Sequence, residues 1–252
     1  MAEKILSGIK LSEIKLSRRL QAVADMVKKG NVVCDVGCDH GFVSIYLVKN
    51  GISPRVIAMD VNEGPLRAAR EHIGEYLLTD YIETRLSDGV SALETGEADT
   101  LICAGMGGKL MKRILEEGKE KVREMKELVL QPQSEIRAVR EYLRSQGYLI
   151  VDENMILEEG KYYPMMKIYP SYRKEPFAEQ FQDTGDLQRI KDKYGPILLE
   201  KKNPVLAAFL RREYDICGQI LDNLHKNGRE QEVRRDEIIN KMKDIETALS
   251  CF

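Results

Sequence analysis

Short apolar segments alternate with helical patterns along residues 31–168, and this alternation restricts the fold more than any other feature of the sequence. Four of these segments, NVVCDVG, PRVIAMDV, ADTLICAG and ELVLQPQ, have the residue types of buried strands. Residues 147–170, GYLIVDENMILEEGKYYPMMKIYP, have the pattern of a pair of strands. Strands that alternate with helices predict right-handed crossovers and a mostly parallel, doubly wound α/β sheet, to which the final pair adds an antiparallel strand.

Helical patterns lie on both sides of this region. Residues 16–30, LSRRLQAVADMVKKG, predict an amphipathic helix with Ser17 as its N-cap and Gly30 beyond its end. After about residue 176 there is no strand signal, and apolar residues at helical spacing predict two antiparallel helices joined by a turn at 226–230. We therefore expect an α/β domain at residues 1–175 and a helical coiled-coil domain at residues 176–252.

Composition restricts the possible classes of protein. No apolar run approaches the roughly 20 residues that a membrane-spanning helix needs, and the N-terminus offers no signal-peptide core. The five cysteines are scattered, and Cys34 and Cys38 have neither a second cysteine pair nor a histidine cluster nearby, so we expect no disulfide framework and no metal. These features predict a cytoplasmic protein. With a net charge of −2, any polyanion must bind to a local basic patch.

The turn DVGCDHG at residues 35–41 follows the first strand and precedes a helix. A dinucleotide-binding pattern would need glycines at two positions where Asp39 and Phe42 stand, and no lysine followed by serine or threonine closes the turn as a phosphate-binding loop would. The order strand, Asp-x-Gly-x-Asp-x-Gly, helix instead resembles the first motif of Rossmann-like class I methyltransferases. Their cofactor, S-adenosylmethionine, is a cation without phosphate, so carboxylates at Asp35 and Asp39 are acceptable neighbours.

Three further stretches place polar residues or glycines after later strands. Asp60 follows Gly41 by 19 residues, where a carboxylate can accept the ribose hydroxyls of an adenosine. RLSDGV would follow the third strand and LICAGMGG ends the fourth. Glycines allow the backbone to approach a ligand closely. The predicted cofactor site comprises Asp35, Gly37, Cys38, Asp39, Gly41, Asp60, Asp88, Gly89, Ala104, Gly105, Met106 and Gly107.

Two absences restrict the methyl acceptor. The fourth strand is not followed by the Asn/Asp-Pro-Pro-aromatic sequence of exocyclic-amine methyltransferases, and no cysteine follows a proline as in many pyrimidine carbon-5 enzymes. The sequence therefore leaves a ring nitrogen, an oxygen or a small molecule as acceptor.

Six stretches along the chain carry a resemblance to one known family. They are LSRRL at 16–20, DVGCDHG at 35–41, LSDGVSAL at 86–93, ICAGMGG at 102–108, LQPQ at 130–133 and EEGKYYPM at 158–165. Together with the helical tail, they make nearly the whole chain resemble the bacterial tRNA (adenine-22-N1)-methyltransferases. The chain departs from that family at 41–44, where Gly-Phe-Val-Ser replaces the more common Ala-Tyr-Leu-Pro, and at Cys38, where serine or threonine is more common.

This resemblance implies transfer of a methyl group from S-adenosylmethionine to the N1 of adenine 22 in tRNA. Separately, we expect the enzyme to be a monomer. The target edge is engaged in folded RNA, so the base must be flipped into the pocket. We take Asp39, His40 and Arg19 as candidate catalytic residues. His40 is equally expected to cap the turn, and Arg19 to form a surface salt bridge.

Candidate substrate-binding residues are aromatic or basic. Tyr162 and Tyr163 are candidates for stacking on the flipped base, although strand aromatics more often pack in a core. Lys109, with Lys112 and Arg113, follows the glycine loop. Basic residues elsewhere that we expect to contact RNA are Arg137, Arg140 and Arg144 on one helical face, and Arg211 and Arg212 in the tail.

Two alternatives remain open at this level. The first is a methyltransferase that acts on a small molecule or a protein and uses its tail for dimerisation. The second is a non-catalytic module that binds RNA or the cofactor.

Overall fold

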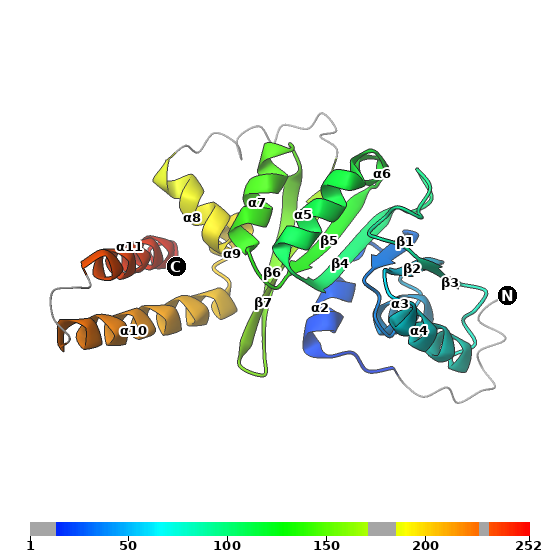
Figure 1. The fold of residues 1–252 in the computed structure, drawn as a ribbon, viewed down its shortest axis with the longest axis horizontal. Helices are drawn as coiled ribbons and strands as arrows, with labels where there is room; N and C mark the ends of the chain where they lie inside the picture. Colours follow the sequence, from blue (N-terminus) through cyan, green and yellow to red (C-terminus); the bar gives the residue numbers. More distant parts are fainter. Residues whose placement is uncertain (1–13, 171–184, 227–231) are drawn as a thin grey trace.

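A seven-stranded sheet forms the centre of the computed structural model, which describes residues 14–170, 185–226 and 232–252 (Figure 1). The strand order is β3-β2-β1-β4-β5-β7-β6. Strands β1 to β5 pair in parallel, whereas β7 is antiparallel to both β5 and β6. The doubly wound sheet with a closing hairpin is therefore confirmed. The strands are β1 Val33–Val36, β2 Val56–Asp60, β3 Ile82–Leu86, β4 Thr100–Met106, β5 Glu127–Pro132, β6 Leu149–Glu158 and β7 Lys161–Tyr169.

Helices cover both faces of the sheet because its central strands are apolar on both sides; β1, β2 and β5 are buried throughout. One face packs against α2 Arg18–Asp25, α3 Phe42–Lys49 and α4 Glu63–Glu75. The other packs against α5 Gly108–Glu117, α6 Lys119–Glu124 and α7 Ile136–Ser145. Ser17 caps α2 as predicted, since its side chain accepts a hydrogen bond from the backbone N–H of Leu20.

The pattern at residues 107–122 reads as one helix, but the structure divides it into α5 and α6 at Gly118. A Cβ at this position would lie 2.1 Å from a methyl carbon of Val90. Close packing against the loop after β3 therefore requires a glycine where the two helices meet.

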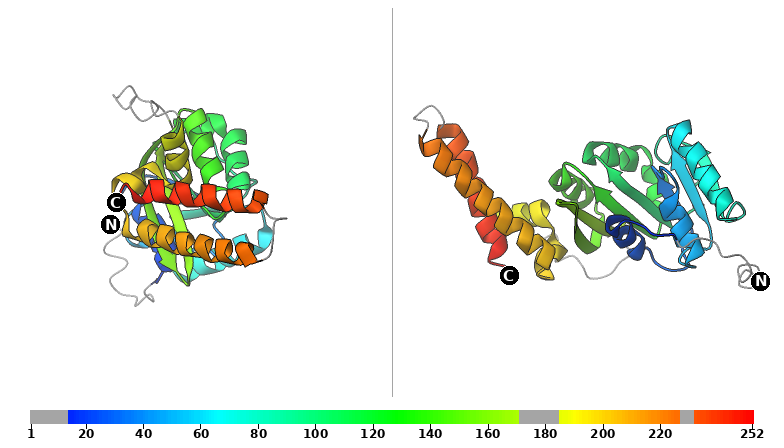
Figure 2. Two further views of the ribbon diagram at one scale, coloured as in Figure 1. Left: turned by 90° about the vertical axis from the view of Figure 1, so that its left-hand side faces the viewer. Right: turned by 90° about the horizontal axis from the view of Figure 1, so that it is seen from below.

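Four helices follow the sheet: α8 Asp186–Tyr194, α9 Pro196–Glu200, α10 Pro204–Lys226 and α11 Glu232–Leu249. Figure 2 shows α10 and α11 side by side, projecting from the end of the sheet that carries β6 and β7. The predicted pair of helices is confirmed, and Leu206, Leu210, Cys217, Ile238 and Ile245 are buried together in it. The coiled-coil geometry stays a prediction. The predicted boundary at 175/176 and most of the predicted turn at 226–230 lie outside the described residues.

The short helices α8 and α9 were not predicted, and a buried ion pair attaches them to the sheet. The side chains of Arg140 in α7 and Glu153 in β6 are 2% and 0% exposed, and Arg140 Nε donates to Glu153 Oε1 at 2.8 Å. Arg140 also donates to the carbonyls of Asp192 and Lys193, and Glu153 accepts from the amide of Ile197. We call this arrangement the junction.

The junction corrects one sequence-based expectation. Arg140 cannot contact RNA as expected, because it is enclosed by Glu153 and the backbone of α8. Arg137 and Arg144 are both partly exposed, but each is paired with a carboxylate, Arg137 with Glu141 at 2.7 Å and Arg144 with Asp192 at 2.8 Å. The helical spacing was read correctly, but it did not show that another part of the chain covers this face.

Candidate functional site

A cleft of about 350 Å³ opens at the carboxyl ends of β1, β2 and β4. It lies where the strand order reverses between β1 and β4, the position at which doubly wound sheets bind their ligands. Nine of the predicted site residues line it: Arg19, Asp35, Gly37, Cys38, Asp39, His40, Asp60, Ala104 and Gly105. The segments that follow three separate strands, together with α2, therefore form one concave surface.

The turn after β1 adopts a backbone that its sequence makes possible. Gly37 and Gly41 both have φ of 74°, and Asp39 has φ of 52°, in the left-handed region. A Cβ at Gly37 would lie 3.2 Å from the terminal methyl of Met106, and one at Gly41 the same distance from the Cβ of Ala69. The glycines thus give the turn its shape and its close packing on both sides.

Asp35 is the most perturbed acid of the cleft. It is buried at the end of β1 and accepts a hydrogen bond of 2.7 Å from the hydroxyl of Ser44. Burial is the main cause that raises the pKa of Asp35 to about 6, and the negative charge of Asp60 raises it further. A cationic ligand in the cleft would relieve this unfavourable environment. Burial likewise raises the pKa of the Cys38 thiol well above its usual range, which disfavours the thiolate that a nucleophile needs.

Among the residues that the structure describes, Arg19 is the only arginine or lysine that lines the cleft. Its Nη1 donates to Gln131 Oε1 at 2.9 Å, and its guanidinium lies over the ring of Tyr163, 5.5 Å from the centroid. A Cβ at Gly105, whose φ is 80°, would lie 3.2 Å from the same Nη1. Arg19 is therefore held above the end of β4 and, within the described part of the chain, forms no salt bridge of the kind that was the simpler expectation.

The position of α2 explains why two of the recognised stretches occur together. The backbone N–H of Arg18, in LSRRL, donates to Glu158 Oε1 at 2.6 Å, and Glu158 opens the stretch EEGKYYPM at the turn of the β6–β7 hairpin. A carboxylate at this end of a helix also interacts favourably with the helix dipole. The hairpin thus fixes the start of α2, which in turn carries Arg19 to the cleft.

His40 contacts aromatic neighbours and the turn itself. Its ring lies 5.8 Å from Phe42, which stacks on His72 at 4.8 Å between centroids. His72 Nδ1 lies 3.0 Å from the carbonyl oxygen of His40, and His40 Nε2 is 3.7 Å from Asp39 Oδ1. These contacts show how the turn is supported on α4 and leave both roles considered for His40 open.

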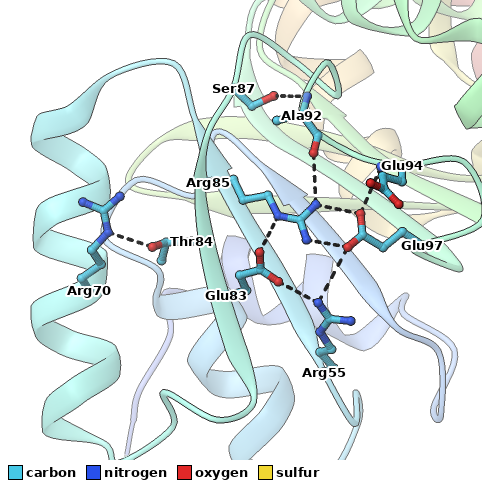
Figure 3. Close-up of polar contacts among 9 residues, drawn as sticks. All are labelled: Arg55, Arg70, Glu83, Thr84, Arg85, Ser87, Ala92, Glu94 and Glu97. Atoms are coloured by element: carbon cyan, nitrogen blue, oxygen red, sulfur yellow. Dashed lines mark hydrogen bonds and ion pairs between the residues drawn. The ribbon is translucent and has the colours of Figure 1, made fainter.

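The loop after β3 carries Asp88 and Gly89, which do not line the cleft. Asp88 forms two hydrogen bonds with Arg113 of α5, at 2.8 and 3.1 Å. Arg85 fixes the rest of this loop (Figure 3): it donates to both carboxylate oxygens of Glu97 and to the carbonyl of Ala92. Ser87 Oγ accepts from the amide of Ala92 and donates to the carbonyl of Gly89. The loop is therefore held in one shape beside the cleft.

Several predicted substrate residues lie apart from the cleft. Neighbouring residues of a strand point to opposite faces, so only Tyr163 contacts Arg19. Tyr162 packs edge-on against Phe209 of α10 at 5.0 Å, and Arg212 lies over its other side, at 5.8 Å from the centroid. The remaining positions are elsewhere: Lys109 and Arg211 are exposed on α5 and α10, Met106 ends β4, and Gly107 is the N-cap of α5.

Four residues line the cleft that sequence reasoning did not select: Leu20, Phe42, Val43 and Gln133. Gln131, which holds Arg19, was also missed. The stretch LQPQ contains both glutamines and lies at a strand end, which was the available signal. The role of this stretch depends on α2, because Arg19 of α2 contacts Gln131 of β5 only in the folded chain.

Among the residues that the structure describes, no cluster of three metal-ligating side chains occurs, and no helix is long and apolar enough to cross a membrane.

Known proteins share both the sequence and this architecture. Residues 16–166 match the methyltransferase domain family. A tRNA (adenine(22)-N(1))-methyltransferase of Bacillus subtilis is 34% identical over 202 residues, which cover 80% of this chain and 81% of the relative. The chain belongs to this methyltransferase family. The resemblance carried by the six stretches is thereby confirmed.

Solved structures of family members extend the likeness to the helical tail. The B. subtilis m1A22 tRNA methyltransferase TrmK has a TM-score of 0.79 and 30% identity, covering 94% of this chain and 100% of that chain. A Streptococcus pneumoniae protein described as a putative tRNA (m1A22) methyltransferase, in complex with S-adenosyl-L-methionine, has a TM-score of 0.78 and 29% identity, covering 93% and 100%. The fold is that of this family along nearly the whole chain.

Proposed function

We propose that this protein is an S-adenosylmethionine-dependent methyltransferase that modifies the N1 of adenine 22 in tRNA. The observation that carries this proposal is the acidic cleft at the switch point of the sheet, in which Asp35, Asp39 and Asp60 surround a glycine turn. Its family membership and its likeness to the tRNA methyltransferases support the same conclusion.

The residues present fit this cofactor. Three carboxylates and the raised pKa of Asp35 favour a cation, and no lysine or arginine stands at the glycine turn to bind a phosphate. When bound, S-adenosylmethionine supplies a methyl group on a sulfonium, which a ring nitrogen takes up as the sulfonium becomes a thioether.

The proposed cofactor contacts follow the order of the strands. Asp60 would hold the ribose hydroxyls, and the backbone of Gly37 to Gly41 would hold the amino acid part of the cofactor. Asp88 and Gly89, in the loop beside the cleft, would be its neighbours on the adenine side. The loop from Ala104 to Gly107 faces the methyl group and the incoming base.

Catalysis then rests on positioning, because the lone pair of the adenine N1 is itself the nucleophile. The methylated base becomes cationic until its amino group loses a proton, so an acceptor that holds this amino group favours the reaction. In this proposal Arg19 and His40 form the walls against which the base is placed, and Asp39 contributes negative charge beside it.

Radioactive methyl transfer to unmodified bulk tRNA, followed by nucleoside analysis, tests this function. We expect label in 1-methyladenosine, and no label in a transcript that carries guanosine at position 22. The Asp60→Ala variant should lose the activity because the ribose contact is gone. Label in protein alone, or in another nucleoside, would overturn the assignment.

The projecting helices α10 and α11 are the proposed tRNA-binding arm. Arg211 and Arg212 are exposed on α10, and we expect their change to glutamate to weaken tRNA binding and to reduce its dependence on salt. Electrophoretic mobility shifts at two salt concentrations measure this. Unchanged affinity removes the arm from the proposal. We further propose that the enzyme acts as a monomer and in the cytoplasm, where bacterial tRNA is modified.

A further inference from the structure

The cleft has two halves, one at the ends of β1 and β2, where we propose that the cofactor binds, and one at the ends of β4 and β5. The carboxyl ends of β1 and β2 carry the acidic residues, whereas the ends of β4 and β5 carry Gly105 and Gln133. A ligand seated across β1 and β2 leaves the space above β4 and β5 for the group that it reacts with.

Gln133 differs from its near neighbour Gln131 in what its side chain can do. Gln131 is fully buried, and its amide is used by Arg19 and by the carbonyl of Pro132. The Gln133 side chain lies at the cleft and is exposed, and within the described part of the chain its amide has no hydrogen-bond partner. Both its donor and its acceptor are thus available to a ligand.

The backbone that carries Gln133 is nevertheless fixed. Its N–H donates to the carbonyl of Met106 at 2.9 Å, and the amide of Gly108 donates to the carbonyl of the next residue, Ser134, at 3.2 Å. A Cβ at Gly105 would lie 3.7 Å from Gln133 Nε2 and 3.2 Å from Arg19 Nη1, so the glycine lets both side chains lie close to the end of β4. A free amide on a fixed backbone, at the wall of the cleft, is suited to recognising a flat polar ligand.

We propose that Gln133 recognises the target adenine by its Hoogsteen edge. The amide oxygen accepts from the exocyclic N6 amine and the amide nitrogen donates to N7, which is the bidentate pairing of glutamine with adenine. This edge is the one that leaves N1 free, whereas an amide on the Watson–Crick edge would block it. The inference rests on the proposed function and names the residue that selects its base.

The same geometry has two chemical consequences. Guanine presents an acceptor, O6, where adenine has its amine, so O6 and the amide oxygen would face each other as two acceptors and guanine would be rejected. The acceptor on N6 also holds the amine whose proton becomes acidic once N1 is methylated, which favours the reaction. Gln133 is therefore expected to influence kcat as well as the choice of base.

Two tRNA transcripts that differ by one atom of the target base test the contact. One carries adenosine at position 22 and the other 7-deazaadenosine, which keeps N1 and the amine but lacks N7. The wild type should lose about tenfold to a hundredfold in kcat/KM on the 7-deaza transcript, as for the loss of a base contact. Gln133→Ala should lose a similar factor on adenosine and lose no more on 7-deazaadenosine.

Two further variants separate recognition from folding. Gln133→Glu keeps an acceptor for N6 but has no donor for N7, so it should retain part of the activity and be insensitive to the 7-deaza change. Gln146→Ala, at the far end of α7, should behave as the wild type on both transcripts. Calorimetry should give each variant the wild-type affinity for S-adenosylmethionine, which shows that the cofactor half is intact.

Each outcome decides the question. Non-additive losses in Gln133→Ala and the 7-deaza transcript support the contact; additive losses, or a fully active Gln133→Ala, overturn it while leaving the methyltransferase assignment in place. If the wild type forms no 1-methyladenosine on the adenosine transcript, the proposed function fails and this inference fails with it.

Discussion

The junction and the cleft both bury charged side chains, and they treat these charges in opposite ways. At the junction, Glu153 faces Arg140 and also accepts from the amide of Ile197, so its charge is matched on every side. In the cleft, the Asp35 carboxylate accepts from the hydroxyl of Ser44, has no cationic partner among the described residues, and lies near the like charge of Asp60. A buried charge that is paired within the protein stabilises the fold, whereas a buried charge without such a partner favours binding of a ligand of opposite charge.

The largest effect is expected when the match at the junction is broken. Glu153→Gln leaves the guanidinium of Arg140 buried without a counter-charge, which costs about 3–5 kcal/mol of the free energy of unfolding. Urea denaturation measures it. The matched control is Glu141→Gln, which breaks the exposed pair with Arg137 and should cost less than about 1 kcal/mol.

Replacing both Arg140 and Glu153 tests whether the junction depends on matched charges. The double variant Arg140→Met/Glu153→Leu removes both charges together, so most of the lost stability should return. If the double variant is as unstable as Glu153→Gln, charge matching is not what holds the junction together.

In the cleft, removing a charge should have the opposite effect on stability. The pKa of Asp35 is raised to about 6 from an ordinary 3.8, so the folded protein holds this proton more tightly than the unfolded chain. Its ionisation therefore costs nothing below about pH 3.8, and the cost grows as pH rises through 6, to about 3 kcal/mol.

Asp35→Asn should accordingly raise the free energy of unfolding at pH 8 and flatten its decline between about pH 4 and 6, while it weakens binding of S-adenosylmethionine. Denaturation at several pH values and calorimetry measure the two effects. The exposed Asp80→Asn is the control and should change neither. A loss of stability at pH 8 in Asp35→Asn would contradict the comparison.

The smallest effect is expected in the loop beside the cleft, where charges are matched but partly exposed. Hydrogen bonds from Arg85 are the main cause that lowers the pKa of Glu97 to about 2, so its stabilising contribution is present above the ordinary 4.5 and is lost as pH falls toward 2. Glu97→Gln should cost about 1–2 kcal/mol at pH 7 and weaken cofactor binding several-fold. Glu94→Gln is the control, since only the backbone of Glu94 binds Glu97.

The features that could be predicted from the sequence are those that depend on residues close together in the chain. The apolar strands, the helices between them and the glycine turn each lie within a short stretch, and so most of the residues that line the acidic part of the cleft were among those selected from the sequence. Tyr162 and Tyr163 show a missed local signal, because the alternation of a strand already excludes that both face one side.

The parts that were not predicted depend on partners distant in the chain. Arg140 has the spacing of an exposed helical residue, and its burial follows from Glu153 in β6 and the carbonyls of α8. Gln131 accepts a hydrogen bond from Arg19, and Gln133 lines the cleft together with Arg19, although Arg19 lies more than 100 residues earlier in the sequence. Neither set of contacts can be predicted from the spacing of residues in the sequence or from its composition.

The paired tyrosines of β7 also limit how this chain can change over time. Tyr163 supports the arginine above the pocket, while the adjacent Tyr162 supports the projecting arm through Phe209 and Arg212. Inserting or deleting one residue in this hairpin would exchange the two rings and disturb both ends of the molecule at once. We expect lengths of this hairpin among descendants to vary in steps of two.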